Sequence, residues 1–161
     1  MEESLSLLGI VKKRIKYETG SLVKQNICDE NNIKIGKYDD VNYFIEFKNL
    51  LDNNNYKFII SDCYPFVPPK VFINKKHILH YYKITNIYFN TLLKKYTEMD
   101  CFCCKTILCS NNWIPTYNFI HILDEFNEYI DMRHQIIIRI FVDVIKNKYL
   151  TYDINIIEWL Y

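Results

Sequence analysis

The chain has 161 residues, and its 20 Lys and Arg residues nearly balance its 19 Asp and Glu residues, for a formal net charge of +1. Half of the residues are hydrophobic, which excludes a disordered chain. This composition and the length predict one domain whose core is large enough to fold without disulfides or a bound metal. The balanced charge creates no overall field that would recruit nucleic acid or an anionic membrane, so we expect neither as a partner.

The sequence shows no targeting pattern. Residues 1–4 hold no basic region ahead of an apolar run, so we expect no secretory signal. The apolar run 136–145 is interrupted by Arg139 and Asp143 and is too short to cross a bilayer. We therefore expect an intracellular protein, cytoplasmic or nuclear, whose six cysteines are thiols unless a metal binds them.

The first half of the chain predicts one helix followed by four strands. Residues 4–18 fit a helix that ends near Gly20. One side of this helix holds Leu5, Leu8, Lys12 and Ile15. Alternating apolar residues then predict strands at 33–37, 42–47, 56–60 and 71–73. An Asn-rich turn at 52–55 joins two of these strands, so we expect an antiparallel meander.

Helical spacing predicts further helices after the strands. A short helix is expected around Leu92 and Leu93. A longer helix is expected to begin near Thr116, which can serve as its N-cap. Its apolar face would hold Phe119, Ile122, Leu123, Phe126 and Ile130. A third helix is expected from 133 to 148, and a final helical turn at 152–161 is expected to dock on the domain.

This order of elements predicts an α+β domain with helices on one sheet. We expect an N-terminal helix, a four-stranded antiparallel meander and C-terminal helices packed on the sheet. A single domain would then span residues 1–161, with a core of about 4–130 and a C-terminal helical extension of about 131–161.

Three short motifs lie between these elements. The first, which we call the hook, is Tyr64-Pro65-Phe66-Val67-Pro68-Pro69-Lys70-Val71. Each proline fixes its own φ angle and favours an extended preceding residue, so we expect a rigid extended segment between two strands. The second motif is Cys104-Lys105-Thr106-Ile107-Leu108, and the third is Trp113-Ile114-Pro115.

Together these motifs resemble the ubiquitin-conjugating enzymes, which carry ubiquitin as a thioester on a cysteine. The hook matches that family's string Tyr-Pro-Phe, any residue, Pro-Pro-Lys-Val, between the third and fourth strands. The cysteine-rich segment and the composition are similar to divergent members from large DNA viruses, over about residues 1–130. The resemblance implies the UBC-like fold and no cofactor. It also implies three partners: ubiquitin or a ubiquitin-like modifier, an activating enzyme and a ubiquitin ligase.

The resemblance also implies a nucleophile. The family's catalytic string, Cys-Leu-Asp/Ser-Ile-Leu, aligns best with Cys104, which Ile107 and Leu108 follow in register, and Cys103 is the fallback. The thiolate is the attacking form, and Lys105, if it lies close in space, would lower the pKa of the thiol. On this alignment the protein would transfer ubiquitin from Cys104 to a lysine.

Partner contacts are implied at the hook, the third motif and the first helix. In the family, the Phe and Pro that match Phe66 and Pro115 help form the surface for activating enzymes and ligases. A packed anchor is the alternative role for Phe66. Basic residues of the first helix help engage the activating enzyme, and here they are Lys12, Lys13, Arg14 and Lys16. A solvated helix face is the other interpretation of these four residues.

The chain departs from the family in one catalytic feature. It lacks the His-Pro-Asn string whose Asn stabilises the oxyanion formed when a lysine attacks the thioester. His77 stands near the expected place, and Asn86 and Asn90 are other conceivable donors. This departure leaves an alternative function open, in which the domain is catalytically inactive and binds ubiquitin or a partner.

The cysteine cluster allows a further alternative. Cys101, Cys104 and Cys109, with His77 or His80, could form a tetrahedral zinc site, although only the first two cysteines have the usual ligand spacing. Buried thiols are the simpler interpretation of the cluster.

Overall fold

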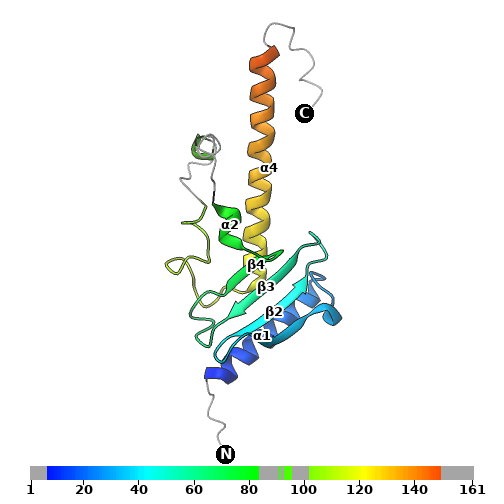
Figure 1. Cartoon of the computed structure of the whole chain (residues 1–161), viewed down its shortest axis with the longest axis vertical. Coiled ribbons are helices and arrows are strands. Elements are labelled where there is room, and N and C mark those ends of the chain that lie inside the picture. Colours follow the sequence, from blue (N-terminus) through cyan, green and yellow to red (C-terminus); the bar gives the residue numbers. More distant parts are fainter. Residues whose placement is uncertain (1–6, 84–90, 92, 96–101, 150–161) are drawn as a thin grey trace, which may run out of the picture.

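The computed structural model describes residues 7–83, 91, 93–95 and 102–149. It has a five-stranded antiparallel sheet with helices, so the predicted α+β class is confirmed (Figure 1). The elements follow one another in the predicted order of helix, strands and helices.

Helix α1 spans Leu7–Lys24 and does not end near Gly20 as predicted. It continues because Leu22, two residues further on, is fully buried in the core. The helix ends where Asn26 adopts a positive φ of 55°, with Ile27 N–H donating to Leu22 O and Asn26 N–H to Val23 O. This pair of bonds is a Schellman motif, in which Asn takes the place of the usual glycine.

The buried face of α1 also differs from the prediction. Its core residues are Val11, Ile15 and Leu22, whereas Lys12 is exposed. The buried positions follow the i, i+4 spacing of one helix face, and Glu18 occupies the place on that face between Ile15 and Leu22.

The strands pair in sequence order from β1 to β5. A short 3-10 helix, η1 (Glu30–Asn32), precedes them. The strands are β1 (Lys34–Lys37), β2 (Tyr43–Lys48), β3 (Asn55–Ile60), β4 (Lys70–Ile73) and β5 (Lys76–His77). The four predicted strands are confirmed to within one residue at each end. The fifth strand was not predicted, because two residues cannot show an alternating pattern.

A tight hairpin forms β5. Asn74 and Lys75 link it to β4, and both have positive φ, 49° and 69°. Positive φ at both central residues is typical of the two-residue turns whose twist suits a hairpin. The sheet therefore has one more strand than the four-stranded meander that we expected.

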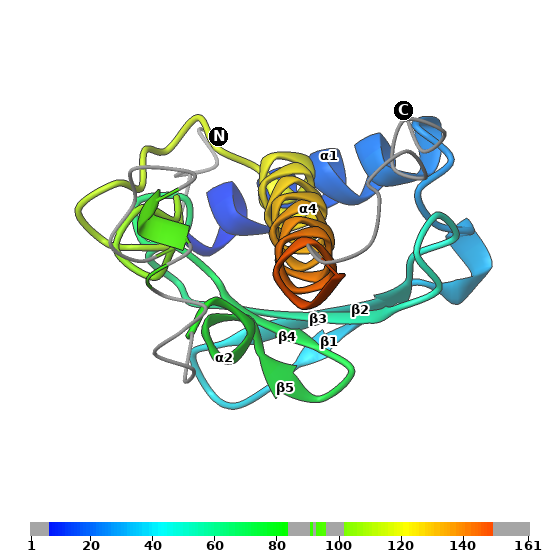
Figure 2. The same ribbon diagram turned by 90° about the horizontal axis from the view of Figure 1, so that it is seen from above.

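Helices α1 and α4 lie on the same face of the sheet (Figure 2). The inward-pointing residues of the strands, such as Ile45, Phe58 and Val71, are fully buried against them. The ring of Phe58 lies 4.6 Å from that of Phe119 at the start of α4. This aromatic contact places the beginning of α4 over the centre of the sheet.

Helix α4 runs without a break over Phe119–Tyr149, so the prediction of two helices is wrong. Neither Gly nor Pro lies near residues 130–133, and nothing there interrupts the helical hydrogen bonds. The first half of α4 packs on the sheet and on helix α2 (Ile78–Tyr82), whereas the second half extends past the sheet (Figure 1). The expected packing of C-terminal helices on the sheet therefore holds only for the first half.

Asn118, and not Thr116, caps α4. The side-chain oxygen of Asn118 accepts a 3.2 Å hydrogen bond from His121 N–H, and His121 Nδ1 accepts one of 3.3 Å from Asn118 N–H. This reciprocal pair is a capping box in which His replaces the usual Glu.

Two of the predicted helices concern residues that the structure describes only in part or not at all. In the segment around Leu92, Thr91 and residues 93–95 are helical, and Leu93 is fully buried. The helical turn expected at 152–161 lies outside the described residues. No helix in the described part of the chain has the length and apolar character needed to span a membrane.

Candidate functional site

The hook begins with hydrogen-bonded turns. The Tyr64–Pro65 peptide bond is cis, Tyr64 N–H donates to Ser61 O, and Phe66 N–H donates to Cys63 O. The prediction of extended backbone is therefore wrong for the start of the hook, because these short-range bonds close turns there. Tyr64 is fully buried, whereas Phe66 is 66% exposed. Phe66 is thus not a packed anchor.

The hook is joined to the third sequence motif by one hydrogen bond. The indole Nε1 of Trp113 donates to Pro65 O over 2.7 Å, and the Trp113 ring lies 6.2 Å from the Tyr64 ring. Trp113 is buried, whereas the two residues that follow each member of the bonded pair are exposed. These exposed residues, which we call the apolar rim, are Phe66, Val67, Ile114 and Pro115.

A buried carboxylate ties the hook to both large helices. Glu18, only 1% exposed, accepts hydrogen bonds from the Tyr64 hydroxyl and from Phe119 N–H. It also forms a salt bridge with Arg14, whose Nη2 donates to Tyr117 O over 2.9 Å. Burial raises the pKa of Glu18, although the bonds from Tyr64 and Arg14 oppose this shift.

The four basic residues expected to contact a partner therefore differ in whether their charge is available at the surface. The guanidinium of Arg14 is committed to intramolecular contacts with Glu18 and Tyr117. The other three, Lys12, Lys13 and Lys16, are exposed. Of the four, these three present their charge to solvent.

Cys104 lies on the loop between residues 102 and 118. Its side chain is exposed, whereas that of the fallback residue, Cys103, is half-buried. The two sulfur atoms are 3.9 Å apart, well beyond the S–S bond length of about 2 Å, so no disulfide joins them. An exposed thiol on this loop can meet a large acyl donor without rearrangement of the core.

Two polar side chains hold the backbone of this loop. The Asn112 amide donates to Cys104 O (2.9 Å) and to Thr106 O (3.0 Å). Glu125 of α4 accepts from the Thr106 hydroxyl (2.6 Å) and from Ile107 N–H (2.7 Å). The position of Cys104 is therefore fixed on both sides, through Asn112 and through the first half of α4.

A small hollow of about 150 Å³ adjoins this loop. Lys105 and Thr106 form one side, and Glu125, Glu128 and Tyr129 of α4 form the other. Its lining carries both signs of charge, and Lys105 directly follows Cys104 in the sequence. Its volume is too small for more than a few atoms of a ligand.

Among the residues of the zinc alternative, His77 has another role and Cys101 lies outside the described part. His77 Nδ1 accepts a 3.3 Å hydrogen bond from Leu79 N–H and so caps α2. Burial lowers the pKa of His77, and Lys70 lowers it further. Cys101 is not described, and the described residues contain no group of three His, Cys, Asp or Glu side chains placed to hold a metal. Among the other conceivable oxyanion donors, Asn86 and Asn90 also lie outside the described residues.

Sequence reasoning missed the residues that hold the site in place: Glu18, Asn112 and Glu125. A signal existed for Glu18, because a carboxylate on the apolar face of a helix is rarely buried without partners. Asn112 and Glu125 gave no comparable signal, since both lie in segments where polar residues are common.

The fold and the site together define an α+β domain with an exposed thiol on a braced loop. Comparison with protein-family models, curated proteins and solved structures finds no match for this chain.

Proposed function

We propose that this protein is a ubiquitin-conjugating transferase of UBC-like fold and that Cys104 is its nucleophile. The observation that carries the proposal is the exposed thiol of Cys104 on a loop whose backbone is held by Asn112 and Glu125. A thioester carrier needs a thiol that two large proteins can reach in turn, and it needs that thiol at a fixed position.

The chemistry is acyl transfer in two steps. The Cys104 thiolate attacks the thioester carbonyl that joins ubiquitin to the activating enzyme. A new carbon–sulfur bond forms, and the activating enzyme's cysteine leaves as a thiolate. In the second step a lysine amine of the substrate attacks the new thioester. The amide forms, Cys104 leaves as a thiolate, and the amine loses a proton. No cofactor bound to this chain takes part.

The apolar rim supports the proposed partners. Phe66 and Pro115 are exposed on two loops that the Trp113–Pro65 hydrogen bond joins. Exposed apolar side chains on braced loops are suited to protein contacts. In this proposal the rim meets the activating enzyme and a ligase, and Lys12, Lys13 and Lys16 add contacts to the activating enzyme.

A thioester assay tests this function. The full chain is incubated with an activating enzyme, ATP and ubiquitin, and the products are separated with and without a reducing thiol. We expect an adduct one ubiquitin heavier that the thiol removes. Cys104→Ala should lose it, Cys104→Ser should form a thiol-resistant ester, and Cys109→Ala should behave as the unsubstituted protein. An adduct that survives Cys104→Ala but not Cys103→Ala would move the nucleophile to Cys103, and no adduct at all would contradict the activity.

A second candidate function is a binding module of the same fold without catalysis. It is favoured by the state of His77, whose Nδ1 is occupied in capping α2 and which therefore offers no simple replacement for the absent His-Pro-Asn string. The apolar rim would serve such a module equally well. This function is tested by titrating Cys104→Ala protein with ubiquitin and following its chemical shifts. Shift changes favour the binding module if the unsubstituted protein also shows no thioester activity. The absence of shift changes at about millimolar ubiquitin, the weak end of specific binding, contradicts it.

A further inference from the structure

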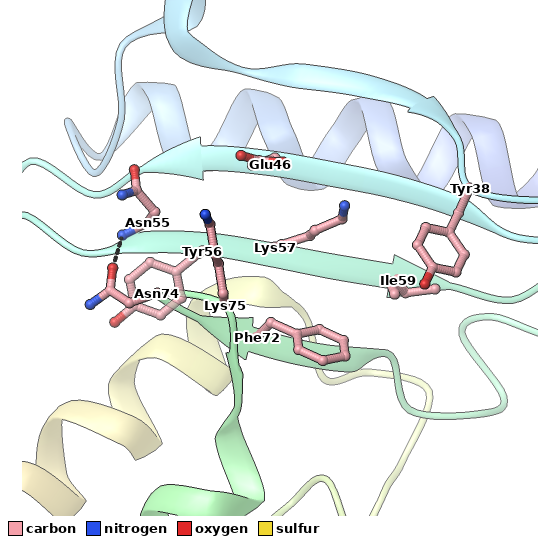
Figure 3. Close-up of a pocket in the computed structure, with 9 residues that line it drawn as sticks. All are labelled: Tyr38, Glu46, Asn55, Tyr56, Lys57, Ile59, Phe72, Asn74 and Lys75. Carbon is pink, nitrogen blue, oxygen red and sulfur yellow. Dashed lines mark hydrogen bonds between the residues drawn. The ribbon is translucent and has the colours of Figure 1, made fainter.

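The sheet face opposite α1 and α4 carries a groove of about 630 Å³ (Figure 3). Tyr38 and Phe72 bound it on the sides, and Lys57 and Ile59 of β3 form its floor. In this view α1 lies behind the sheet, so the groove opens on the face that neither large helix covers (Figures 2 and 3). Its volume is within the range of pockets that hold small ligands.

Strand register explains which residues meet on this face. Side chains alternate between the two faces of a strand, and the inward positions are taken by the core. The outward positions then form cross-strand rows. One row runs through Lys34, Glu46, Lys57, Phe72 and His77. The neighbouring row runs through Gly36, Phe44, Ile59 and Lys70.

The charge of this face is not balanced, unlike that of the whole chain. Its lysines are Lys34, Lys48, Lys57, Lys70 and Lys75, and the acids near them are Glu46 and Asp39. Asp39 already accepts bonds from Val41 N–H and from Asn42. Within the described residues, none of these five ammonium groups forms a salt bridge. The face therefore offers a local excess of positive charge.

Aromatic rings alternate with these charges. The ammonium of Lys57 lies 5.4 Å from the ring centre of Tyr38 and 4.9 Å from that of Phe44, so two cation–π contacts hold its charge beside the groove. Tyr38 is 53% exposed, and Phe72 is half-buried with its ring in the groove (Figure 3). At one end, Asn55 N–H donates to Asn74 Oδ1 over 3.0 Å, and the exposed Asn55 side chain points away from Asn74, where it can donate and accept hydrogen bonds (Figure 3).

We propose that this groove binds single-stranded nucleic acid. Phosphates would contact Lys57 and Lys75, one base would stack on Phe72 or Tyr38, and Asn55 would meet a base edge. Exposed rings and lysines on an uncovered antiparallel sheet supply the two interactions that single strands need, stacking and phosphate neutralisation. An acidic peptide would use the lysines but not the rings, and a duplex keeps its bases stacked inside, out of reach of Phe72. The proposal does not depend on Cys104 or on the proposed transferase activity.

Fluorescence anisotropy of the full chain with labelled single strands of about 12 nucleotides, within the usual site size, tests this proposal. We expect binding that weakens about 20-fold between about 50 and 200 mM salt if three phosphates are neutralised. Lys57→Gln/Lys75→Gln should reduce the salt slope by about 1.4. Phe72→Leu keeps an apolar side chain but removes the stacking surface, and it should weaken binding by about 5-fold or more.

The matched control is Lys24→Gln/Lys146→Gln, which removes the same charge from exposed positions on α1 and on the second half of α4. We expect the affinity of this variant to stay within about 2-fold of the unsubstituted protein, since neither lysine belongs to the sheet face. Three results would each overturn the proposal: no binding at about 50 mM salt, where phosphate contacts are strongest; equal loss in the control; or competition by polyglutamate as strong as that by unlabelled single strands.

Discussion

The hydroxyl of Tyr64 donates a 2.5 Å hydrogen bond to the carboxylate of Glu18, 46 positions earlier in the chain. The same carboxylate accepts from the N–H of Phe119, the first residue of α4, over 3.0 Å. One buried acid therefore joins α1, the hook and α4. Because both the apolar rim and the Cys104 loop lie next to these elements, Glu18 supports the whole candidate site.

Tyr64→Phe removes only the hydroxyl of this bond. We expect the free energy of unfolding to fall by about 1.5–3 kcal/mol, the usual range for a hydrogen bond to a charged group. Tyr17→Phe is the matched control, since Tyr17 is on the same helix as Glu18 and is 66% exposed, and it should change stability by less than about 0.5 kcal/mol. Urea denaturation measures both. Equal effects of the two substitutions would refute the role given to Tyr64.

Strands β2, β3 and β4 were predictable from sequence because each places alternate residues in the core, whereas β1 has no buried residue. In β3, for example, the apolar positions Tyr56, Phe58 and Ile60 alternate with outward residues, and the structure buries all three. A period of two is a strong signal when the pairing is antiparallel. The ends of the helices were less predictable. Gly20 did not stop α1, because burial of Leu22 further along outweighs the small helix penalty of one glycine.

Cys104 was selected by its motif as the proposed nucleophile, whereas the side chains that hold its loop were not predicted. The hydrogen bonds of Asn112 and Glu125 join residues 6 to 19 positions apart, and three of the four involve a backbone group. Backbone carbonyls and amides occur at every position, so a sequence pattern cannot show which of them a side chain meets. The fifth strand and the Asn118 cap were missed for a related reason, since each depends on the geometry of one or two residues.

Asn112→Ala should loosen the loop that carries Cys104. The substitution removes both donors to Cys104 O and Thr106 O, while Asn111→Ala, at an exposed neighbouring position, serves as control. We expect stability to fall by about 1–2 kcal/mol for two lost bonds at a partly exposed site. We also expect the rate of thioester formation to fall by more than in the Asn111 variant, because the thiol is no longer held in place. If both variants charge at the unsubstituted rate, the loop needs no such support.

Phe66→Ala tests the apolar rim separately from the core. Phe66 is two-thirds exposed, so we expect the free energy of unfolding to change by less than about 0.5 kcal/mol. Binding to an activating enzyme or a ligase should weaken about 10-fold or more, since truncation of an exposed aromatic anchor commonly removes a main contact of an interface. Calorimetry with the partner measures this. Tyr64→Ala is the contrasting variant, because it should lower stability as well as binding. Undiminished affinity in Phe66→Ala would exclude the residue from the interface.

His77 should make stability depend on pH. Its pKa is lowered by burial and by Lys70, and its Nδ1 accepts the bond that caps α2. The unfolded chain, with a His pKa of about 6.5, therefore binds the proton more readily than the folded protein. This contribution to stability is complete above that value and is lost as the pH falls below it. His77→Asn keeps a capping acceptor without titrating. Melting temperatures at several pH values should fall more steeply below neutral pH in the unsubstituted protein than in this variant; parallel curves would contradict the assignment.

Two glycines should respond in opposite ways to alanine. A Cβ at Gly20, inside the last third of α1, would meet no atom within 4 Å, whereas a Cβ at Gly36 in β1 would lie 2.7 Å from the ring of Phe44. Gly20→Ala should therefore raise the free energy of unfolding by about 0.5–1 kcal/mol, the difference in helix propensity.

Gly36→Ala should lower the free energy of unfolding by about 1 kcal/mol or more, because the Phe44 ring must move and its cation–π contact with Lys57 is lost. The same movement would disturb the position of Lys57 in the floor of the sheet groove. Gly36→Ala should therefore also weaken binding of the single strand, while Gly20→Ala should leave that binding unchanged. Urea denaturation and anisotropy measured on the same two proteins check both expectations. A Gly36→Ala protein that matches the unsubstituted chain in both measurements would show that the ring does not hold the position described for it.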